Sequence, residues 1–238
     1  MLTAEKVKLL GVSKVIEEYL KQKYEEERKE RKIGYYFPSH LPYCLRRQYW
    51  DYKEPVEPSD ESLKIFFIGD LIHEAIQQIL ERKLKAKSER KILIPVDPVR
   101  EIFITGRADS VFEDEEGNTY VVEIKTVSSL TYRDKQTNEI REMEKPKPHH
   151  VLQIMPYLYA FNAKGIIVYI ERNSFKTKEF EIRKDPAILQ QVFHRARKLH
   201  EYLLARKLPP PEARNDPVRK WECNYCPYKW KCFTKEFL

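Results

Sequence analysis

Two carboxylates and one ammonium group occupy neighbouring stretches of the chain, GRAD and VEIKT. Asp109 ends the first stretch, and Glu123 and Lys125 lie in the second. Both stretches are predicted strands joined by the short turn EEGN, so these side chains can converge at one sheet edge. Paired carboxylate oxygens suit Mg²⁺ or Mn²⁺. Lys125 shares a strand face with Glu123, where an ammonium group can orient a water and offset charge on a phosphate.

A Glu-x-Lys pair on a strand is, taken alone, most often an exposed ion pair. The surroundings favour a metal site instead, because Glu123 lies in the apolar run VVEIK, where an unpaired carboxylate is costly. His73, on a predicted helix, is a further candidate ligand, although a lone helical histidine is more often structural. It lies one turn after Gly69, a residue that permits close approach. A neutral imidazole beside the carboxylates would favour Mn²⁺ over Mg²⁺.

The cysteines form a second group with the chemistry of a metal site. Three lie within ten residues, in WECNYCPYKWKCF, and no histidine is near them. The only other cysteine, in YCLRRQYW, is therefore the candidate fourth ligand. Four thiolates with one distant in sequence are typical of an iron–sulfur cluster, and both 4Fe–4S, which we favour, and 2Fe–2S accept such a set. Zinc and two disulfides are the alternatives. The four expected ligands are Cys44, Cys223, Cys226 and Cys232.

Hydrophobic periodicity predicts the elements that would position these groups. Helices are expected at residues 13–32, from Ser39 to Pro55, and at 63–86, 150–161 and 185–207. Strands are expected at residues 91–97, 101–114, 118–126, 165–171 and 177–183. Residues 128–148 have no strong period and are expected to form a functional or mobile loop. The order predicts an α/β fold, or more specifically an α+β mixed sheet flanked by helices.

Composition and charge restrict the class of protein. Hydrophobic residues make up 42% of the 238 residues, which is enough for a sizeable core. The sequence contains neither a long apolar run nor a signal-peptide pattern, so we expect a cytoplasmic protein with no membrane partner. The net charge is +7, and residues 183–238 carry all of the excess, with 13 Lys or Arg against 6 Asp or Glu. Such a localised excess favours an anionic partner, with a solvated helix face as the alternative.

Basic and aromatic residues surround the cysteines in sequence. A cluster that joined Cys44 to the tail would hold these residues together, beside rings such as Tyr43 and Trp221. Cations with aromatic faces suit single-stranded DNA, although packing around the cluster would explain the rings equally well. His149 and His150 could contact DNA at the mouth of the site, although loop histidines are usually solvated. The candidate DNA-binding residues are Arg46, Arg47, Lys229 and Lys231.

The order of these motifs resembles that of RecB-like PD-(D/E)XK nucleases. It runs G-x-x-x-H, G-R-A-D, E-I-K-T and then Q-x-x-x-Y, the last containing Gln153 and Tyr157. With one upstream and three C-terminal cysteines, the chain resembles the CRISPR-associated exonucleases of the Cas-four family over about residues 44–232. The resemblance implies a restriction-endonuclease-like nuclease core at residues 63–208. An N-terminal helical region would span residues 1–62, and the iron–sulfur segment would span 209–238.

The resemblance also implies roles for individual residues. Mn²⁺ or Mg²⁺ would be held by His73, Asp109, Glu123 and the carbonyl of Ile124. Lys125 would be the catalytic lysine, and Gln153 and Tyr157 would position Lys125 or the DNA backbone. Pro156 departs from the pattern, because a proline inside the Q-x-x-x-Y helix predicts a kink that would alter the aim of Tyr157.

The expected function is a metal-dependent DNA exonuclease that acts on single-stranded DNA. The resemblance implies 5′-to-3′ polarity and a role in CRISPR adaptation, trimming precursor spacers alongside the spacer-integration proteins. Two alternatives stay open: a RecB-type repair nuclease outside CRISPR, and a module that binds DNA ends or a flanking motif with little cleavage. A homo-oligomer is compatible with the sequence.

Overall fold

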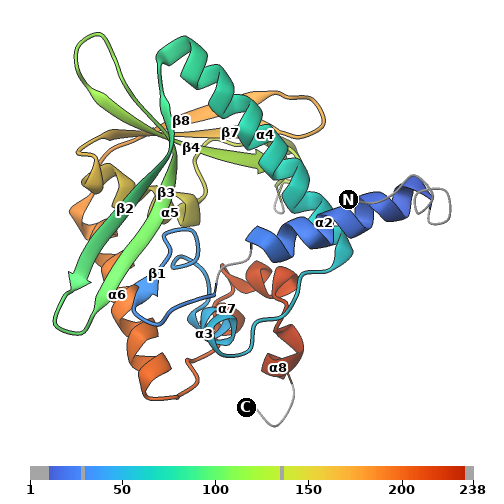
Figure 1. The fold of residues 1–238 in the computed structure, drawn as a ribbon, viewed down its shortest axis with the longest axis vertical. Helices are drawn as coiled ribbons and strands as arrows, with labels where there is room; N and C mark the ends of the chain where they lie inside the picture. Colours follow the sequence, from blue (N-terminus) through green and yellow to red (C-terminus); the bar gives the residue numbers. More distant parts are fainter. Residues whose placement is uncertain (1–10, 28–29, 135–136, 234–238) are drawn as a thin grey trace.

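A mixed β-sheet flanked by helices forms the centre of the molecule (Figure 1), as the sequence predicted. The structure is a computed structural model that describes residues 11–27, 30–134 and 137–233. The strands are β1 (Tyr35–Tyr36), β2 (Lys87–Asp97), β3 (Ile102–Glu113), β4 (Thr119–Val127), β5 (Thr131–Arg133), β6 (Ile140–Glu142), β7 (Lys164–Glu171) and β8 (Thr177–Ile182). The helices are α2 (Val12–Glu27), α3 (Leu45–Lys53), α4 (Asp60–Leu84), α5 (Pro148–Ala160), α6 (Pro186–Leu204), α7 (Glu212–Asn215), the 3-10 helix η1 (Lys220–Tyr225) and α8 (Lys229–Phe233).

Strand β3 pairs with three other strands of the sheet. One of its edges pairs antiparallel with β2 along nearly its whole length. Its other edge is shared, because β1 pairs parallel with residues 103–104 and β4 pairs antiparallel with residues 110–113. Beyond β4, the sheet continues through β7, which is parallel, and β8, which is antiparallel. Residues 105–109 of β3 therefore lie in a gap between β1 and β4, and GRAD falls within this gap.

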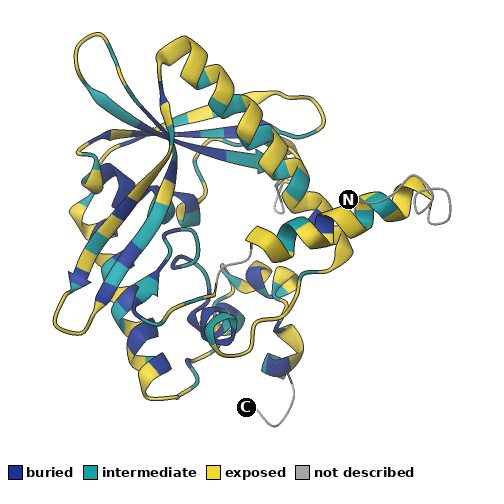
Figure 2. Cartoon of the chain, viewed as in Figure 1, coloured by how far each residue is buried: buried dark blue, intermediate teal, exposed yellow. Residues whose placement is uncertain are grey.

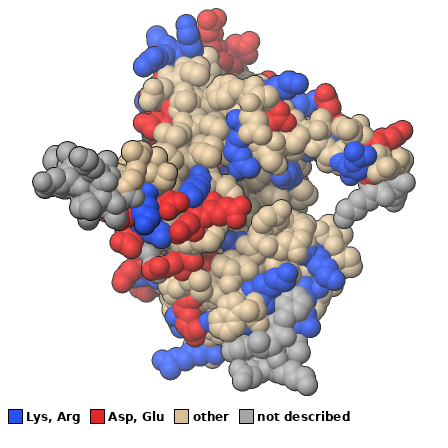
Figure 3. All heavy atoms as spheres, turned by 90° about the vertical axis from the view of Figure 1, so that its right-hand side faces the viewer, with Lys and Arg blue, Asp and Glu red and all other residues tan. Residues whose placement is uncertain are grey.

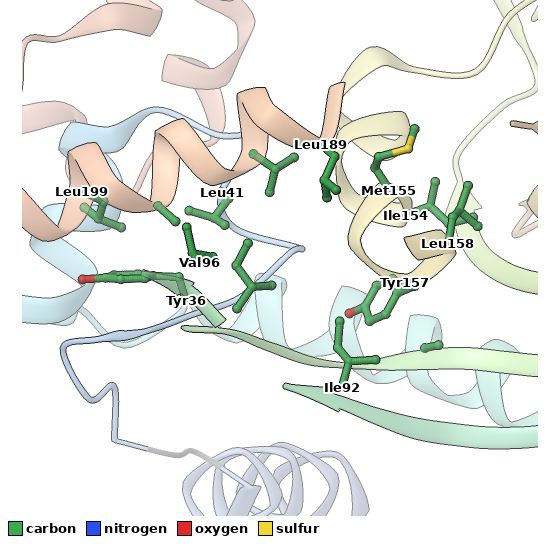
Figure 4. Close-up of a cluster of buried hydrophobic side chains, with 14 of the residues drawn as sticks. Tyr36, Leu41, Ile92, Val96, Ile154, Met155, Tyr157, Leu158, Leu189 and Leu199 are labelled. Atoms are coloured by element: carbon green, nitrogen blue, oxygen red, sulfur yellow. The ribbon is translucent and has the colours of Figure 1, made fainter. Parts of the chain in front are cut away.

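The main core lies between the sheet and helices α5 and α6. Figure 4 shows Ile154, Met155 and Leu158 of α5 and Leu189 and Leu199 of α6, packed with residues from β1, β2 and the turn before α3. Asp185 caps α6 by accepting the backbone N–H groups of residues 187 and 188. These contacts fix α5, which carries the Q-x-x-x-Y motif, against the sheet.

Helix α4 covers the opposite face of β4. Ile72, Ile76 and Leu80 pack against a smaller buried cluster of Val122, Ile124 and Ile170. Ser59 caps the helix, since its hydroxyl accepts the N–H of Ser62. Most other residues of α4 and of α2, which crosses it, are exposed or half-buried (Figure 2). None of the helices in the described part of the chain is long and apolar enough to span a membrane.

Helix α3 begins later than the sequence predicted. Residues 37–43 form turns, and the helix starts at Leu45 with Cys44 at its N-cap and no side-chain cap of its own. The tail provides the missing acceptors. Glu222 accepts the N–H of Cys44 at 2.8 Å, and Glu212 accepts the N–H of Leu45 at 2.7 Å. The start of α3 is thus set by two distant carboxylates rather than by Ser39.

The stretch expected to be an irregular loop contains a small hairpin. Within residues 128–148, β5 and β6 pair antiparallel, and the N–H of Met143 also bonds the carbonyl of Leu130 at 2.8 Å. Both strands are only three residues long and fully exposed, which explains why they leave no alternating apolar pattern in the sequence. Residues 135–136 of this stretch lie outside the described residues.

Candidate active site in the gap beside strand β3

Asp109 lies at the edge of the gap, where β3 and β4 separate. The ladder between the two strands ends at the pair Ser110–Val122. The N–H of Ile124 therefore has no β3 backbone partner, and it donates instead to Oδ2 of Asp109 at 2.7 Å. The N–H and C=O of one residue in a strand point to the same side, so the Ile124 carbonyl also faces the gap. The sequence thus brings a carboxylate and a carbonyl together here.

Glu123 is the most enclosed polar group of the site, at 1% exposure. Its Oε1 accepts a hydrogen bond from Nζ of Lys125 at 2.6 Å and another from Nε2 of Gln153. Its Oε2 is buried and has no hydrogen-bond partner among the described residues. An unpaired buried carboxylate oxygen is costly, so this atom is suited to bind a cation.

His73 projects from α4 toward the same carboxylates. Its Nδ1 lies 3.8 Å from Oδ2 of Asp109. Burial, followed by the Lys125 ammonium, lowers the pKa of His73, which favours the neutral imidazole that a metal ligand requires. Gln77, one turn further along α4, donates to the carbonyl of Asp109 at 2.9 Å. The sequence interpretation missed Gln77, although its i+4 spacing from His73 places both on one helix face.

The positive charge of Lys125 only partly balances the two carboxylates, Asp109 and Glu123. Burial raises the pKa of Asp109 to about 6 and that of Glu123 to about 7, and for Glu123 the charge of Asp109 adds to the effect of burial. Burial alone would lower the pKa of Lys125, but the two carboxylates outweigh it and raise that pKa. One ammonium group thus faces two acids. A divalent cation would make ionisation of both favourable.

The donor set fits Mg²⁺ or Mn²⁺. It offers carboxylate oxygens from Asp109 and Glu123, the Ile124 carbonyl and one imidazole nitrogen from His73, and hard cations prefer such oxygen ligands. In the described part of the chain, however, no three His, Cys, Asp or Glu side chains are already placed around a common point. The carboxylates instead bond Lys125, Gln153 and the backbone. Metal binding would therefore require these side chains to shift.

Gln153 and Tyr157 both reach the site, although Pro156 lies between them. Helix α5 continues through Pro156 to Ala160. Gln153 bonds Glu123, while Tyr157 is 3% exposed and packs over Gly106. A Cβ at Gly106 would lie 2.5 Å from the Tyr157 hydroxyl oxygen, closer than such contacts allow. The proline at position 156 therefore leaves both side chains directed at the gap.

A cavity of about 920 Å³ opens beside the site. It extends from Asp109, Gln153 and Tyr157 past the turn before α3 to the last turn of α2. Its lining includes Arg31, Lys91 and Arg107, together with several carboxylates. The face drawn in Figure 3 likewise carries intermingled basic and acidic side chains.

All four cysteines line a second, small pocket together with Glu222. They are free thiols, so the two disulfides that the sequence left open do not form here. Burial, followed by the nearby thiols, raises the pKa of Cys223, and burial raises the pKa of Cys226 to about 11. A bound metal or cluster would remove this penalty by replacing the protons, so four soft sulfur donors in one pocket fit an iron–sulfur cluster or zinc.

Two of the four candidate DNA-binding residues are turned inward. Arg46 is buried and donates to the carbonyl of Pro209 at 2.6 Å. Lys231 is buried too, paired with Glu54 and 4.0 Å from the centre of the Trp50 ring. Of the candidates, only Arg47 and Lys229 keep solvent-accessible side chains.

Several cations of the positively charged C-terminal quarter also have internal partners. Arg195 pairs with Glu212 at 2.6 Å, and Arg219 pairs with Glu222 at 2.7 Å. The Arg195–Glu212 bond holds the tail against α6. Both pairs lie within residues 183–238, so they leave the net positive charge of that segment unchanged.

The two adjacent histidines behave differently from each other. His150 is buried, and its Nδ1 lies 2.8 Å from the Tyr169 hydroxyl, so it is a structural residue and does not lie at the mouth of the site. His149, in the first turn of α5, is half-buried and faces Tyr43 and Trp221. Only His149 therefore remains a candidate for contact with a substrate.

Comparison with known proteins connects this geometry to characterised families. The chain is 28% identical to the CRISPR-associated exonuclease Cas4 of Saccharolobus solfataricus, over 93% of this chain and 98% of the relative. The fold is similar to that in the crystal structure of SSO0001, with a TM-score of 0.63, 24% identity and coverage of 95% and 97% of the two chains. The expected resemblance to CRISPR-associated exonucleases is confirmed.

The family model for the PD-(D/E)XK nuclease superfamily matches residues 82–233. That stretch includes Asp109, Glu123, Lys125 and Gln153, the residues that meet in the gap beside β3. The match covers well over half of the chain. With its mixed sheet and this arrangement of acidic and basic groups, the chain belongs to the PD-(D/E)XK nuclease superfamily.

Proposed function

We propose that the protein is a metal-dependent exonuclease that degrades single-stranded DNA. The observation that carries this proposal is the Glu123 carboxylate, which is buried with one oxygen lacking a partner, beside Asp109 and Lys125. When bound, Mn²⁺ or Mg²⁺ would lower the pKa of a coordinated water and polarise the phosphate. The ligands would be His73, Asp109, Glu123 and the Ile124 carbonyl.

The chain's own groups would prepare the phosphate for attack. The Lys125 ammonium is held beside Glu123 and would offset the negative charge that develops on the phosphate in the transition state. Gln153 would fix the rotation of the Glu123 carboxylate through its hydrogen bond to Oε1. Tyr157, packed over Gly106, would close the back of the gap. Burial of Glu123 beneath these side chains would strengthen its electrostatic interactions.

The biological role that we propose is the trimming of precursor spacers in CRISPR adaptation, with 5′-to-3′ polarity, in the cytoplasm and beside the spacer-integration proteins. Similarity to the Saccharolobus exonuclease along nearly the whole chain supports this role. We further propose that Cys44 and the three tail cysteines hold an iron–sulfur cluster, 4Fe–4S rather than 2Fe–2S, as a structural clamp. The shared pocket of the four thiols supports the clamp.

The decisive experiment is cleavage of single-stranded DNA labelled separately at each end, with Mn²⁺, Mg²⁺ or EDTA. Wild type is compared with Glu123→Gln and Lys125→Ala, and with Glu113→Gln as a control, since that carboxylate is exposed at the far end of β3. We expect degradation that requires the metal, is lost in both site variants and persists in the control. The order in which the two labels are released gives the polarity.

The remaining outcomes discriminate between the alternatives. Degradation that survives in Glu123→Gln and Lys125→Ala would overturn the assigned site. DNA that is bound but not cut by the wild type would favour the end-binding module. Purified protein containing zinc and no iron would replace the proposed cluster with a zinc site.

A further inference from the structure

Three aromatic rings from distant parts of the chain meet at His149, one turn of α5 before Gln153, whose side chain bonds Glu123 of the active site. Tyr43 precedes α3, His149 lies in the first turn of α5 and Trp221 lies in η1. The ring of His149 is 5.4 Å from that of Tyr43 and 5.2 Å from that of Trp221, centre to centre. Trp221 is 40% exposed, and the other two rings are half-buried. We refer to these three residues as the aromatic cluster.

The aromatic cluster lies in the positive field of the catalytic lysine. Burial, followed by the charges of Lys147, Lys125 and Arg219, lowers the pKa of His149 to about 4. The guanidinium of Arg47 lies 5.6 Å from the centre of the Tyr43 ring. Cations beside partly exposed aromatic rings match a ligand that has flat rings and negative charges.

Hydrogen bonds hold the backbone segments that carry Tyr43 and Trp221. The carbonyl of Tyr43 accepts hydrogen bonds from Gln48 at 2.8 Å and from Arg195 at 2.6 Å. Trp221 is followed by Glu222, which is bonded to the N–H of Cys44. Preorganised side chains lose little conformational entropy on binding, so they favour a specific ligand over a nonspecific contact.

We propose that Tyr43, His149 and Trp221 form a stacking subsite for one base of the DNA strand, next to the phosphate that is cleaved. The proposal rests on the proposed nuclease function, because it places the base relative to that reaction. Every base has a π-face, so the subsite would tolerate any sequence. Proximity of the aromatic cluster to Lys125 would set the register between the stacked base and the phosphate.

The subsite links the cysteine pocket to catalysis. Tyr43 immediately precedes Cys44, and Trp221 lies two residues before Cys223. Both rings therefore belong to segments that a cluster would hold together. A group bound by the cysteines would position the substrate without touching it.

The test is binding of single-stranded oligonucleotides in EDTA, so that no cleavage occurs. A set of oligonucleotides, each with one abasic position at a defined distance from the 5′ end, is compared with the intact strand. Wild type is measured beside Trp221→Ala, Trp221→Phe and Trp230→Ala. Trp230 is the control, because it is 58% exposed on the same tail and outside the aromatic cluster.

Trp221→Ala should weaken binding of the intact strand by roughly 5- to 150-fold, the range for loss of one stacked base. At one position of the set, the abasic site should weaken wild-type binding by a similar factor. The same strand should bind Trp221→Ala almost as tightly as the intact strand does. Trp221→Phe should recover most of the affinity, and Trp230→Ala should match the wild type. Melting temperature and iron content, measured for each variant, confirm that the tail is intact. If Trp221→Ala does not fold, His149→Ala provides the same comparison.

The subsite would be overturned if Trp221→Ala binds like the wild type, or if the abasic penalties are equal in both proteins. These results are independent of the nuclease proposal, which depends on cleavage and on Glu123→Gln. A protein that shows the abasic pattern but cuts nothing would retain the subsite and lose the nuclease function. A protein that cuts DNA but shows no abasic pattern would retain the nuclease function and lose the subsite.

Discussion

Glu123 receives both of its hydrogen bonds on one oxygen. Lys125 and Gln153 donate to Oε1, which fixes the carboxylate plane, while Oε2 has no donor among the described residues. We therefore expect Gln153 to hold the carboxylate in position and to take no part in the chemistry itself. Its contribution should appear as a change in metal affinity.

Replacing Gln153 with Ala should raise the Mn²⁺ concentration needed for half-maximal cleavage by about 10- to 100-fold, the usual cost of losing a residue that orients a ligand. The maximal rate at saturating metal should change less. A titration of activity against Mn²⁺ measures this, with Gln190→Ala, exposed on α6, as the control. An unchanged midpoint would show that Gln153 does not orient Glu123.

Gly106 is required by its contact with Tyr157 and not by its backbone conformation. Gly106→Ala should lower the free energy of unfolding by about 1–3 kcal/mol through overpacking, since the new Cβ would lie 2.5 Å from the Tyr157 hydroxyl. Adding Tyr157→Phe removes that oxygen and should restore part of the loss. Chemical denaturation of both variants measures the effect.

Gly69→Ala is the matched control for this substitution. The sequence suggested that Gly69 allows close approach, but a Cβ there would meet only Thr126 Oγ1, at an ordinary 3.6 Å. Alanine should therefore be neutral, or stabilise α4 by up to about 1 kcal/mol. Equal destabilisation by the two glycine substitutions would contradict the steric explanation.

His40 should make the protein less stable in acid. Burial, followed by Arg31 and Arg47, lowers its pKa to about 3, and Nδ1 lies 3.1 Å from the Arg31 guanidinium, which needs a free lone pair there. The unfolded chain binds the proton below about pH 6.5 and folded His40 does not, so the free energy of unfolding falls as pH drops between these values. The contribution is at most about 1.4 kcal/mol per pH unit.

Urea denaturation at pH 7 and pH 5 checks this expectation. His40→Gln should reduce the loss of stability between the two pH values. His194→Gln, an exposed site on α6, should leave that loss unchanged. If all three proteins lose the same stability, groups other than His40 cause the acid sensitivity.

At the scale of elements, the sequence predicted every long strand and helix, because those segments carry strong apolar periods. It also predicted the face of α5 that carries Gln153 and Tyr157. It could not predict the gap in the sheet, since the gap depends on β1, a strand of only two residues. Nor could the sequence predict that the Arg46 side chain turns inward. Its partner is a carbonyl 163 positions away, and no local pattern encodes such a bond.

The start of α3 provides a test at this scale. Glu222→Ala would leave the buried N–H of Cys44 without an acceptor and should cost about 1–3 kcal/mol. For a protein of this size the melting temperature should fall by roughly 2–12 °C. Glu179→Ala, on exposed β8, is the control, and iron content shows whether the cysteine pocket is retained. A melting temperature equal to that of the wild type would mean that another group caps α3.

At the scale of the whole molecule, we expect the proposed cluster at the four cysteines to help hold the tail in place. Cys226→Ser should weaken binding of that cluster and free the segment after α6. Trypsin should then cut several-fold faster at exposed Arg206 or Lys207. Mass spectrometry of timed digests measures the rate and the site, with Asn224→Ser in the same segment as the control. Equal rates in both variants would show that other contacts hold the tail.

The capping of α3 from the tail also has a consequence for the newborn chain. Glu212 and Glu222 lie 167 and 178 positions after the residues whose N–H groups they accept. A ribosome that adds 5–20 residues per second needs roughly 10–35 s to cover that distance. Throughout this interval the first N–H groups of α3 lack the carboxylates that accept them, and Cys44 lacks the three tail cysteines. Translation speed thus sets how long this thiol is open to oxidants, and the proposed cluster could be assembled only after that time.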